Sequence, residues 1–207
     1  MKPPFPEEIA ETCWHQLDSA RQALHNCRNA QSSADYKTFR LEWGAFLRRT
    51  GSVIHALKAG CYASPQRKQW FGRFEKDARK DKFLLYMIQA RGAEEHSGPS
   101  TSVAPDSLTF DGHGGTYQAS GPGPMVHVGP EGVRLNRGMM RSVEGVSPTI
   151  RFDSEGPALQ TVHNTLHGDS FDPPESFGGR RVHFRKPVEM GELYAAYLEE
   201  ILKTAME

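Results

Sequence analysis

The sequence has no excess of charge of either sign and no long apolar run. Its 25 lysine and arginine residues are matched by 25 aspartate and glutamate residues, so the formal net charge at pH 7 is zero. A neutral chain has no global field that would attract nucleic acid or an anionic membrane, so any site for a polyanion must be local. Nothing in the chain approaches the roughly 18 consecutive apolar residues of a membrane-spanning helix. We therefore predict no membrane association.

Cysteine is also scarce, because the chain has only Cys13, Cys27 and Cys61. The three are odd in number, lie far apart and form no CxxC pair, which favours buried free thiols in a reducing compartment over disulfides or a zinc site. The first residues, 1–8, lack the apolar core of a signal peptide. These absences predict a cytoplasmic protein, and they imply no metal and no cofactor.

The length of 207 residues suffices for one domain or two small ones, and helical patterns dominate its first half. Apolar residues recur at steps of three and four over 6–30 and again over 35–59, which predicts two amphipathic helices. Asp35 is the expected N-cap of the second helix, and Gly60 is expected to close it. We thus expect two long helices joined by a short turn.

A third helical segment begins at Ser64, which can cap it, with Pro65 at the first helical position. An aromatic stretch is followed by the polar interval 75–81 and then by the apolar run 82–96. The polar interval leaves open whether this segment is one helix or two. Ser97-Gly98-Pro99 then stops any helix.

The composition changes at Ser97, where glycine and proline become frequent and the helical period is lost. Short alternating or β-branched runs replace it, and 129–132 has the residues of a hairpin turn between two of them. This pattern predicts a small antiparallel β subdomain. The expected strands cover residues 107–110, 125–128, 133–135, 148–152, 159–162 and 181–184.

Helical periodicity returns over 187–206. The predicted fold class is therefore α+β, with a helical bundle over 1–98, a β subdomain over 99–186 and a C-terminal helix over 187–207. The last helix can complete a four-helix bundle with the N-terminal helices, or it can cover the sheet. The sequence leaves both arrangements open.

The segment from Arg67 to Arg91 is locally basic, with eight lysines and arginines against three acidic residues. One interpretation is a solvated helix face. The other is a phosphate-facing patch, for which Arg79, Lys80 and Lys82 are the candidate nucleic-acid-binding residues.

The apolar run 82–96 ends in Arg91-Gly92-Ala93-Glu94-Glu95-His96, an arginine followed five positions later by a histidine. This spacing resembles the R-x4-6-H motif of HEPN domains, helical bundles that often act as metal-independent ribonucleases. The helix with Trp43-Gly44-Ala45-Phe46-Leu47 and the run entering the motif resemble the same family. The resemblance covers about residues 7–96 and leaves the β subdomain outside.

The resemblance implies roles for two residues and a quaternary structure. Arg91 would hold the scissile phosphate, which its planar fork suits, and His96 would be the general acid or base. The family brings two copies of the motif together in a homodimer. The alternative from the residues themselves is a structural one, in which Arg91 pairs with Glu95 at i, i+4 and the cluster only packs the bundle.

Two further clusters carry weaker signals. His163, His167 and Asp169 lie close in sequence but match no recognised zinc spacing, so no metal site is predicted. Arg181, His183 and Arg185 would share one face of a strand, which fits a charged edge strand or a second phosphate-contacting surface.

The sequence thus predicts a HEPN-like ribonuclease, a toxin or defence component, with RNA as partner. The alternative is a non-catalytic scaffold or binding protein whose β subdomain recognises another protein.

Overall fold

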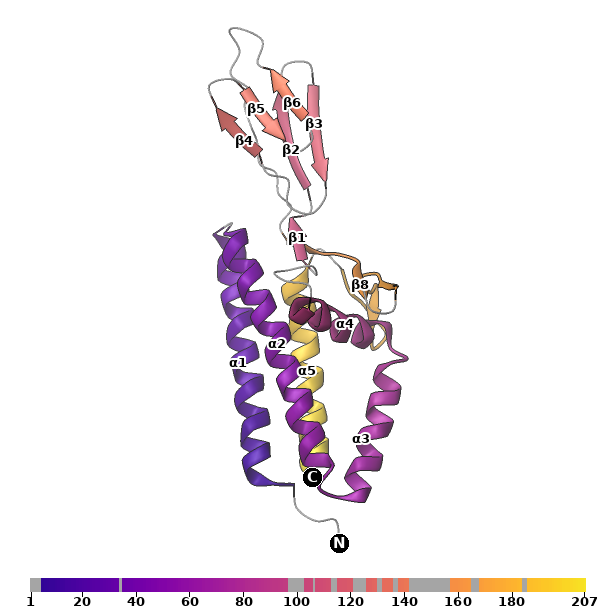
Figure 1. The fold of residues 1–207 in the computed structure, drawn as a ribbon. Helices are drawn as coiled ribbons and strands as arrows, with labels where there is room; N and C mark the ends of the chain where they lie inside the picture. Colours follow the sequence, from indigo (N-terminus) through magenta and orange to yellow (C-terminus); the bar gives the residue numbers. More distant parts are fainter. Residues whose placement is uncertain are drawn as a thin grey trace.

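The computed structural model describes residues 5–33, 35–96, 157–164, 168–183 and 186–207, together with the backbone of six strands between residues 103 and 141. In this part the fold is mostly helical, with a β region between the fourth and fifth helices (Figure 1). The helices are α1 Glu7–Ser32, α2 Tyr36–Cys61, α3 Pro65–Ala78, α4 Lys82–His96 and α5 Pro187–Met206.

The helix starts follow the local signals in the sequence. The Asp35 carboxylate accepts a hydrogen bond from the Thr38 amide at 3.0 Å and caps α2. The Ser64 hydroxyl accepts from the Arg67 amide at 3.3 Å and caps α3, with Pro65 at its first position. Both predicted caps are confirmed, because an N-cap oxygen satisfies an amide that the helix leaves without a partner.

The polar interval divides the third segment into two helices. The Asp81 carboxylate accepts hydrogen bonds from the amides of Phe83 at 2.8 Å and Leu84 at 3.0 Å, so it starts α4. The expected end of α2 at Gly60 is wrong, because α2 continues to Cys61. Gly60 is buried inside the helix, where a Cβ would lie 2.2 Å from Cζ of Phe5. The glycine makes room for the N-terminal segment and does not terminate the helix.

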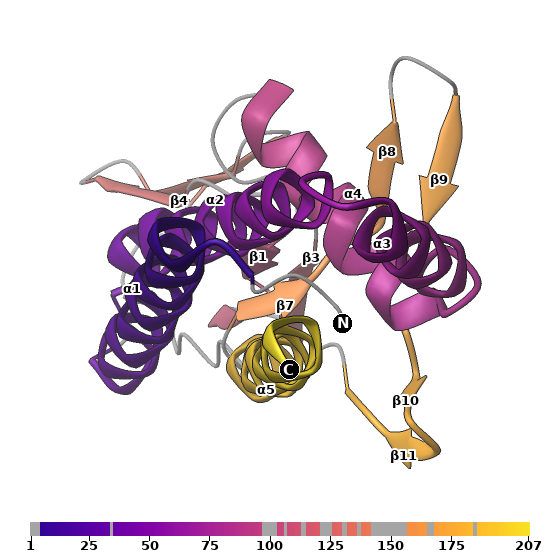
Figure 2. The same ribbon diagram turned by 90° about the horizontal axis from the view of Figure 1, so that it is seen from below.

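The core lies where α1, α2 and α5 run side by side, and α4 adds the buried side chains of Phe83, Tyr86 and Met87 to it (Figures 1 and 2). Trp43 and Phe46 of α2 are fully buried, and Tyr194 of α5 packs edge-on to Phe46 with ring centroids 6.5 Å apart. The C-terminal helix therefore packs on α1 and α2, which decides between the two arrangements that the sequence left open. The first turn of α1 and the last turn of α5 lie at the same end of the bundle (Figure 1).

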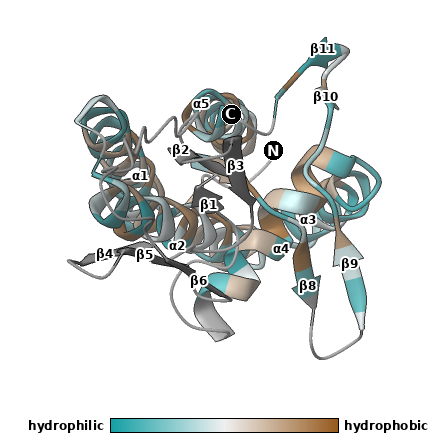
Figure 3. Cartoon of the chain, turned by 90° about the horizontal axis from the view of Figure 1, so that it is seen from above, coloured by the Kyte–Doolittle hydropathy of each residue, from teal (hydrophilic) through white to brown (hydrophobic). Residues whose placement is uncertain are grey.

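The helices α1 and α3 carry hydrophilic and hydrophobic residues on different sides (Figure 3). This is the pattern of amphipathic helices whose apolar stripe faces a core.

The three cysteines lie in that core as buried free thiols, as predicted. Burial raises the pKa of Cys13 to about 11 and that of Cys27 to about 12, so both remain protonated near neutral pH. Among the described residues, no helix is both long and apolar enough to cross a membrane.

The close approach of α5 to α1 depends on Gly191. A Cβ at this position would lie 2.5 Å from Cδ2 of Leu24 and 3.3 Å from Cε1 of Phe46. Gly191→Ala is expected to lower the free energy of unfolding by about 1 kcal/mol, because overpacking costs roughly 1–3 kcal/mol and the gain in helix propensity offsets about 1. Urea denaturation measures this. The matched control is Gly72→Ala on α3, where a Cβ meets nothing within 4 Å, and the helix gain alone should stabilise it. Equal stabilities of the two variants would contradict the prediction.

The strand pairs in the described β region are all antiparallel, as expected. The strands are β1 Val103–Pro105, β2 Ser107–Gly112, β3 Gly115–Ser120, β4 Val126–Gly129, β5 Gly132–Leu135, β6 Gly138–Arg141, β7 Pro157–Leu159, β8 Val162–Asn164, β9 Asp169–Phe171, β10 Ser176–Phe177 and β11 Arg180–Arg181. They form pairs β1–β7, β2–β3, β8–β9 and β10–β11 and the three-stranded sheet β4–β5–β6. The predicted hairpin at 129–132 is confirmed by the pairing of Gly129 with Gly132. The predicted strand 148–152 lies outside the described residues.

Two predicted strands are shorter than expected. The run 159–162 divides between β7 and β8, since the buried Tyr86 donates its hydroxyl to the Gln160 carbonyl at 2.8 Å. Of the described residues 181–183, only Arg181 belongs to a strand, although Val182 is buried between exposed neighbours as the alternation predicts. The Val182 amide still donates to the Glu175 carbonyl at 2.9 Å, and residue 184 lies outside the described residues.

Candidate anion-binding site around Arg91

Two glycines on one face of α2 seat the C-terminal half of α4. A Cβ at Gly51 would lie 2.4 Å from Nε and 2.5 Å from Cδ of Arg91. A Cβ at Gly44 would lie 3.1 Å from Oε2 of Glu94. Gly44 and Gly51 are seven residues apart, which is about two helical turns, so they share a face of α2. This face fixes where the Arg91 side chain crosses α2.

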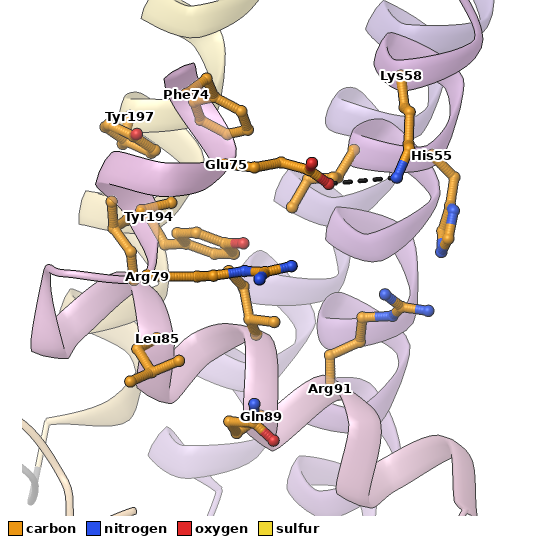
Figure 4. A pocket seen from close by; sticks show the side chains of 14 residues that line it. His55, Lys58, Phe74, Glu75, Arg79, Leu85, Gln89, Arg91, Tyr194 and Tyr197 are labelled. Carbon is orange, nitrogen blue, oxygen red and sulfur yellow. Dashed lines mark hydrogen bonds and ion pairs between the residues drawn. The ribbon is translucent and has the colours of Figure 1, made fainter. Parts of the chain in front are cut away.

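Arg91 reaches a cavity of about 420 Å³ between α2, α3, α4 and α5 (Figure 4). Figure 4 shows the Arg79 side chain extending into this cavity beside the Tyr194 hydroxyl, and the Arg91 side chain rising from α4 toward α2. His55 of α2 lies beside Arg91 in the same view. We call this cavity the Arg91 pocket; its lining residues are Ile54, His55, Lys58, Phe74, Glu75, Ala78, Arg79, Leu84, Leu85, Ile88, Gln89, Arg91, Tyr194 and Tyr197.

The Arg91 pocket is electropositive. Among the described lining residues, Lys58, Arg79 and Arg91 stand against one carboxylate, that of Glu75, which accepts from Lys58 at 3.3 Å and joins α3 to α2. Within the described part of the chain, the Arg79 guanidinium has no ion pair. An excess of positive charge in a partly enclosed cavity favours an anionic ligand, because the walls exclude water and weaken screening.

The tyrosines of the pocket remain hydrogen-bond donors near neutral pH. Burial raises the pKa of Tyr194, and the nearby Arg91 guanidinium opposes this only in part. Burial, together with the charges of Asp81 and Asp77, raises the pKa of Tyr197 to about 12. A protonated phenol can donate to a phosphate oxygen, so the Tyr194 hydroxyl adds a neutral donor to the cationic groups.

The structure places the predicted site residues in different surroundings. Arg79 and Arg91 meet in the Arg91 pocket. Lys80 is on the surface and pairs with Asp77 at 3.0 Å, and Lys82 is exposed at the start of α4, outside the lining of the pocket. The backbone of His96 ends α4, and its side chain lies outside the described residues, as does that of Glu95.

Arg67 does not belong to a basic surface, although the sequence groups it with the cations that follow. It is 3% exposed, and its guanidinium lies over the Phe5 ring, 5.2 Å from the centroid. It also donates a hydrogen bond to the Ala205 carbonyl in the last turn of α5. Arg67 therefore joins both chain ends to α3.

His55 and Lys58 were missed by the sequence reasoning. They lie on the polar side of α2, three residues apart, and the motif-based argument considered only the basic residues after Arg67. The signal available was the helical spacing of Arg48, Gly51, His55 and Lys58, which places polar and small residues on one face. Without the position of α4 this face is typical of any solvent-exposed helix side.

A second cavity of about 350 Å³ lies on the other side of the crossing between α2 and α4. It is also rich in cations, and Glu94, which is 8% exposed, is the one carboxylate among the residues described around it. We call it the α2 N-terminal pocket; its lining residues are Tyr36, Lys37, Arg40, Leu41, Gly44, Arg48 and Glu94. Cationic side chains thus follow one face of α2 on both sides of α4.

The two other clusters singled out in the sequence, around His163 and around Arg181, line neither of these two pockets. His163 shares a hydrogen bond of 2.9 Å with Ser170 on the neighbouring strand and is exposed. In the part of the chain that is described, no group of three or more His, Cys, Asp or Glu residues could hold a metal ion. His167 and Arg185 lie outside that part.

The fold defines an α+β protein with a helical bundle and inserted antiparallel hairpins. The chain matches no family model, and comparison with curated proteins and with solved structures gives no match.

Proposed function

We propose that the protein is a metal-independent ribonuclease of the HEPN type, active as a homodimer, with Arg91 binding the scissile phosphate. The observation that carries the proposal is the position of the Arg91 guanidinium in an electropositive cavity, together with Arg79 and the imidazole of His55. Cations on both sides of α4 would give a strand more than one phosphate contact along α2.

The reaction requires two proton transfers and charge stabilisation. A general base removes the proton of a ribose 2′-hydroxyl, whose oxygen attacks phosphorus, and the bond from phosphorus to the 5′-oxygen breaks. A general acid protonates that leaving oxygen, which gives a 2′,3′-cyclic phosphate and a 5′-hydroxyl. Guanidinium groups stabilise the charge that develops on the phosphoryl oxygens. His96, which the motif specifies, and His55, in the pocket, are the two imidazoles that can transfer the protons.

The test is incubation of the full-length protein with a labelled single-stranded RNA in EDTA. Wild-type protein is expected to cleave it to products with a cyclic phosphate. His96→Ala should reduce the rate by about 10²-fold or more, since general acid–base catalysis contributes roughly 10²–10⁴-fold. Arg91→Met should reduce it by about 10²-fold, the size of effect typical for loss of one group that stabilises transition-state charge. His55→Ala shows whether the second imidazole takes part.

The matched control is Arg49→Met, which removes a guanidinium from α2 on the side that hydrogen-bonds Gln16 of α1. It should cleave at the wild-type rate, and circular dichroism should show every variant folded. Intact RNA with wild-type protein, or equal cleavage by all variants, would refute the ribonuclease.

The second candidate is a non-catalytic scaffold or binding protein. It is favoured by Glu94, which is buried at the contact of α4 with Gly44 and places a carboxylate three residues after Arg91. In this case Arg91 and Glu94 serve to seat α4. Arg91→Met would then lower the free energy of unfolding, and no variant would affect RNA.

A further inference from the structure

We propose that the Arg91 pocket binds a nucleoside phosphate, with the phosphate between Arg79 and Arg91 and the ring system against the apolar wall. The inference rests on the proposed function in assigning the phosphate to Arg91, but it does not require cleavage.

The phosphate position follows from the charged groups. Arg79, which follows the last residue of α3, and Arg91 of α4 both line the pocket, so a phosphate bound there can accept hydrogen bonds from guanidinium groups (Figure 4). Charge-assisted bonds of this kind are about twice as strong as neutral ones. The Tyr194 hydroxyl points into the same space and offers a further donor. His55, which is exposed at the edge of the pocket, can reach an oxygen from the α2 side.

The ring position follows from the rest of the lining. A site for a bare anion would be polar throughout, whereas Ile54, Leu85 and Ile88 form an apolar wall next to the cations. Phe74 and Tyr197 add aromatic surface, with ring centroids 6.3 Å apart in a stacked arrangement. Planar bases gain free energy from apolar and aromatic surfaces of this kind. The ligand must therefore combine an anion with an apolar planar part.

The size and polarity of the cavity agree with such a ligand. Its volume of about 420 Å³ lies in the range of roughly 300–1,000 Å³ typical of small-molecule sites. Gln89 also lines it, and an amide side chain offers both a donor and an acceptor to the edge of a base. A phosphorylated nucleoside has an anionic group for the cations and a planar base for the apolar and amide side chains. Inorganic phosphate can contact only the cations.

The experiment is calorimetric titration of the full chain in EDTA with 5′-AMP, adenosine and inorganic phosphate. AMP is expected to bind at least about 10-fold more tightly than adenosine or phosphate. Arg79→Met and Arg91→Met should each weaken AMP binding by about 10-fold, since loss of a charge-assisted hydrogen bond of this size corresponds to roughly one decade in Kd. Arg49→Met should bind AMP as the wild type does.

Two results would overturn the inference: AMP binding no tighter than phosphate, or equal weakening by Arg49→Met and Arg79→Met. Competition with oligoadenylate identifies the source of the nucleotide. Displacement of AMP would assign the pocket to one unit of an RNA strand, and its absence would assign it to the free nucleotide. RNA cleavage without AMP binding refutes only this inference, and AMP binding without cleavage refutes only the ribonuclease.

Discussion

Replacing Arg67 with methionine is expected to lower the free energy of unfolding by about 3 kcal/mol, because Arg67 joins three parts of the chain. Its side chain is 3% exposed, its guanidinium lies over the Phe5 ring, and it donates to the Ala205 carbonyl. Methionine retains much of the volume but leaves that carbonyl without its donor, which costs about 1–3 kcal/mol. Loss of the cation–π contact adds about 0.5–2 kcal/mol.

Urea denaturation of wild-type and variant protein measures this difference. The matched control is Arg73→Met, which removes an exposed guanidinium from the same helix and should change the free energy of unfolding by less than about 0.5 kcal/mol. If Arg67→Met unfolds at the wild-type urea concentration, the buried guanidinium does not hold the chain ends. Fluorescence of Trp70, which is on α3, can follow the same transition.

Arg67 also shows where sequence reasoning fails. The cap of α3 was predicted because Ser64 and Pro65 act on neighbouring backbone groups, and local signals of this kind predicted the caps of both α2 and α3. The burial of Arg67 depends on Phe5 and Ala205, which lie at the two ends of the chain. No local pattern relates residues so far apart in the sequence. The residues around Arg67 therefore do not distinguish a buried arginine from an exposed one.

The residues of the candidate site also fall into those that local sequence signals indicate and those that depend on the tertiary structure. The motif pointed to Arg91 and the basic segment included Arg79, and both side chains line the Arg91 pocket, while their roles in binding RNA stay predictions. Nothing in the sequence brought His55 to Arg91, since their proximity depends on how α4 crosses α2. At that crossing the side chains of Glu94 and Arg91 lie over Gly44 and Gly51, and this role of the two glycines can be recognised only when the facing residues are known.

The last prediction concerns the crossing of α2 and α4. Gly51→Ala is expected to lower the affinity for AMP without lowering the free energy of unfolding. A Cβ at Gly51 would lie 2.4 Å from Nε of Arg91, so the Arg91 guanidinium must move. It is the far end of a flexible side chain, and its movement requires little repacking of the core. Alanine also gains about 1 kcal/mol of helix propensity over glycine. AMP affinity should therefore fall about 10-fold, as in Arg91→Met, while the free energy of unfolding stays equal or rises.

Gly72→Ala separates the two effects, because a Cβ there meets nothing within 4 Å and Gly72 is outside the Arg91 pocket. It should gain the same helix propensity and bind AMP as the wild type does. A Gly51→Ala protein with wild-type affinity would show that Arg91 does not set the ligand position. A loss of more than about 2 kcal/mol in stability would show instead that α4 itself is displaced, because the cost would then be that of overpacking a helix contact. Calorimetry and urea denaturation of the same two variants therefore distinguish a ligand-binding Arg91 from one that only seats α4.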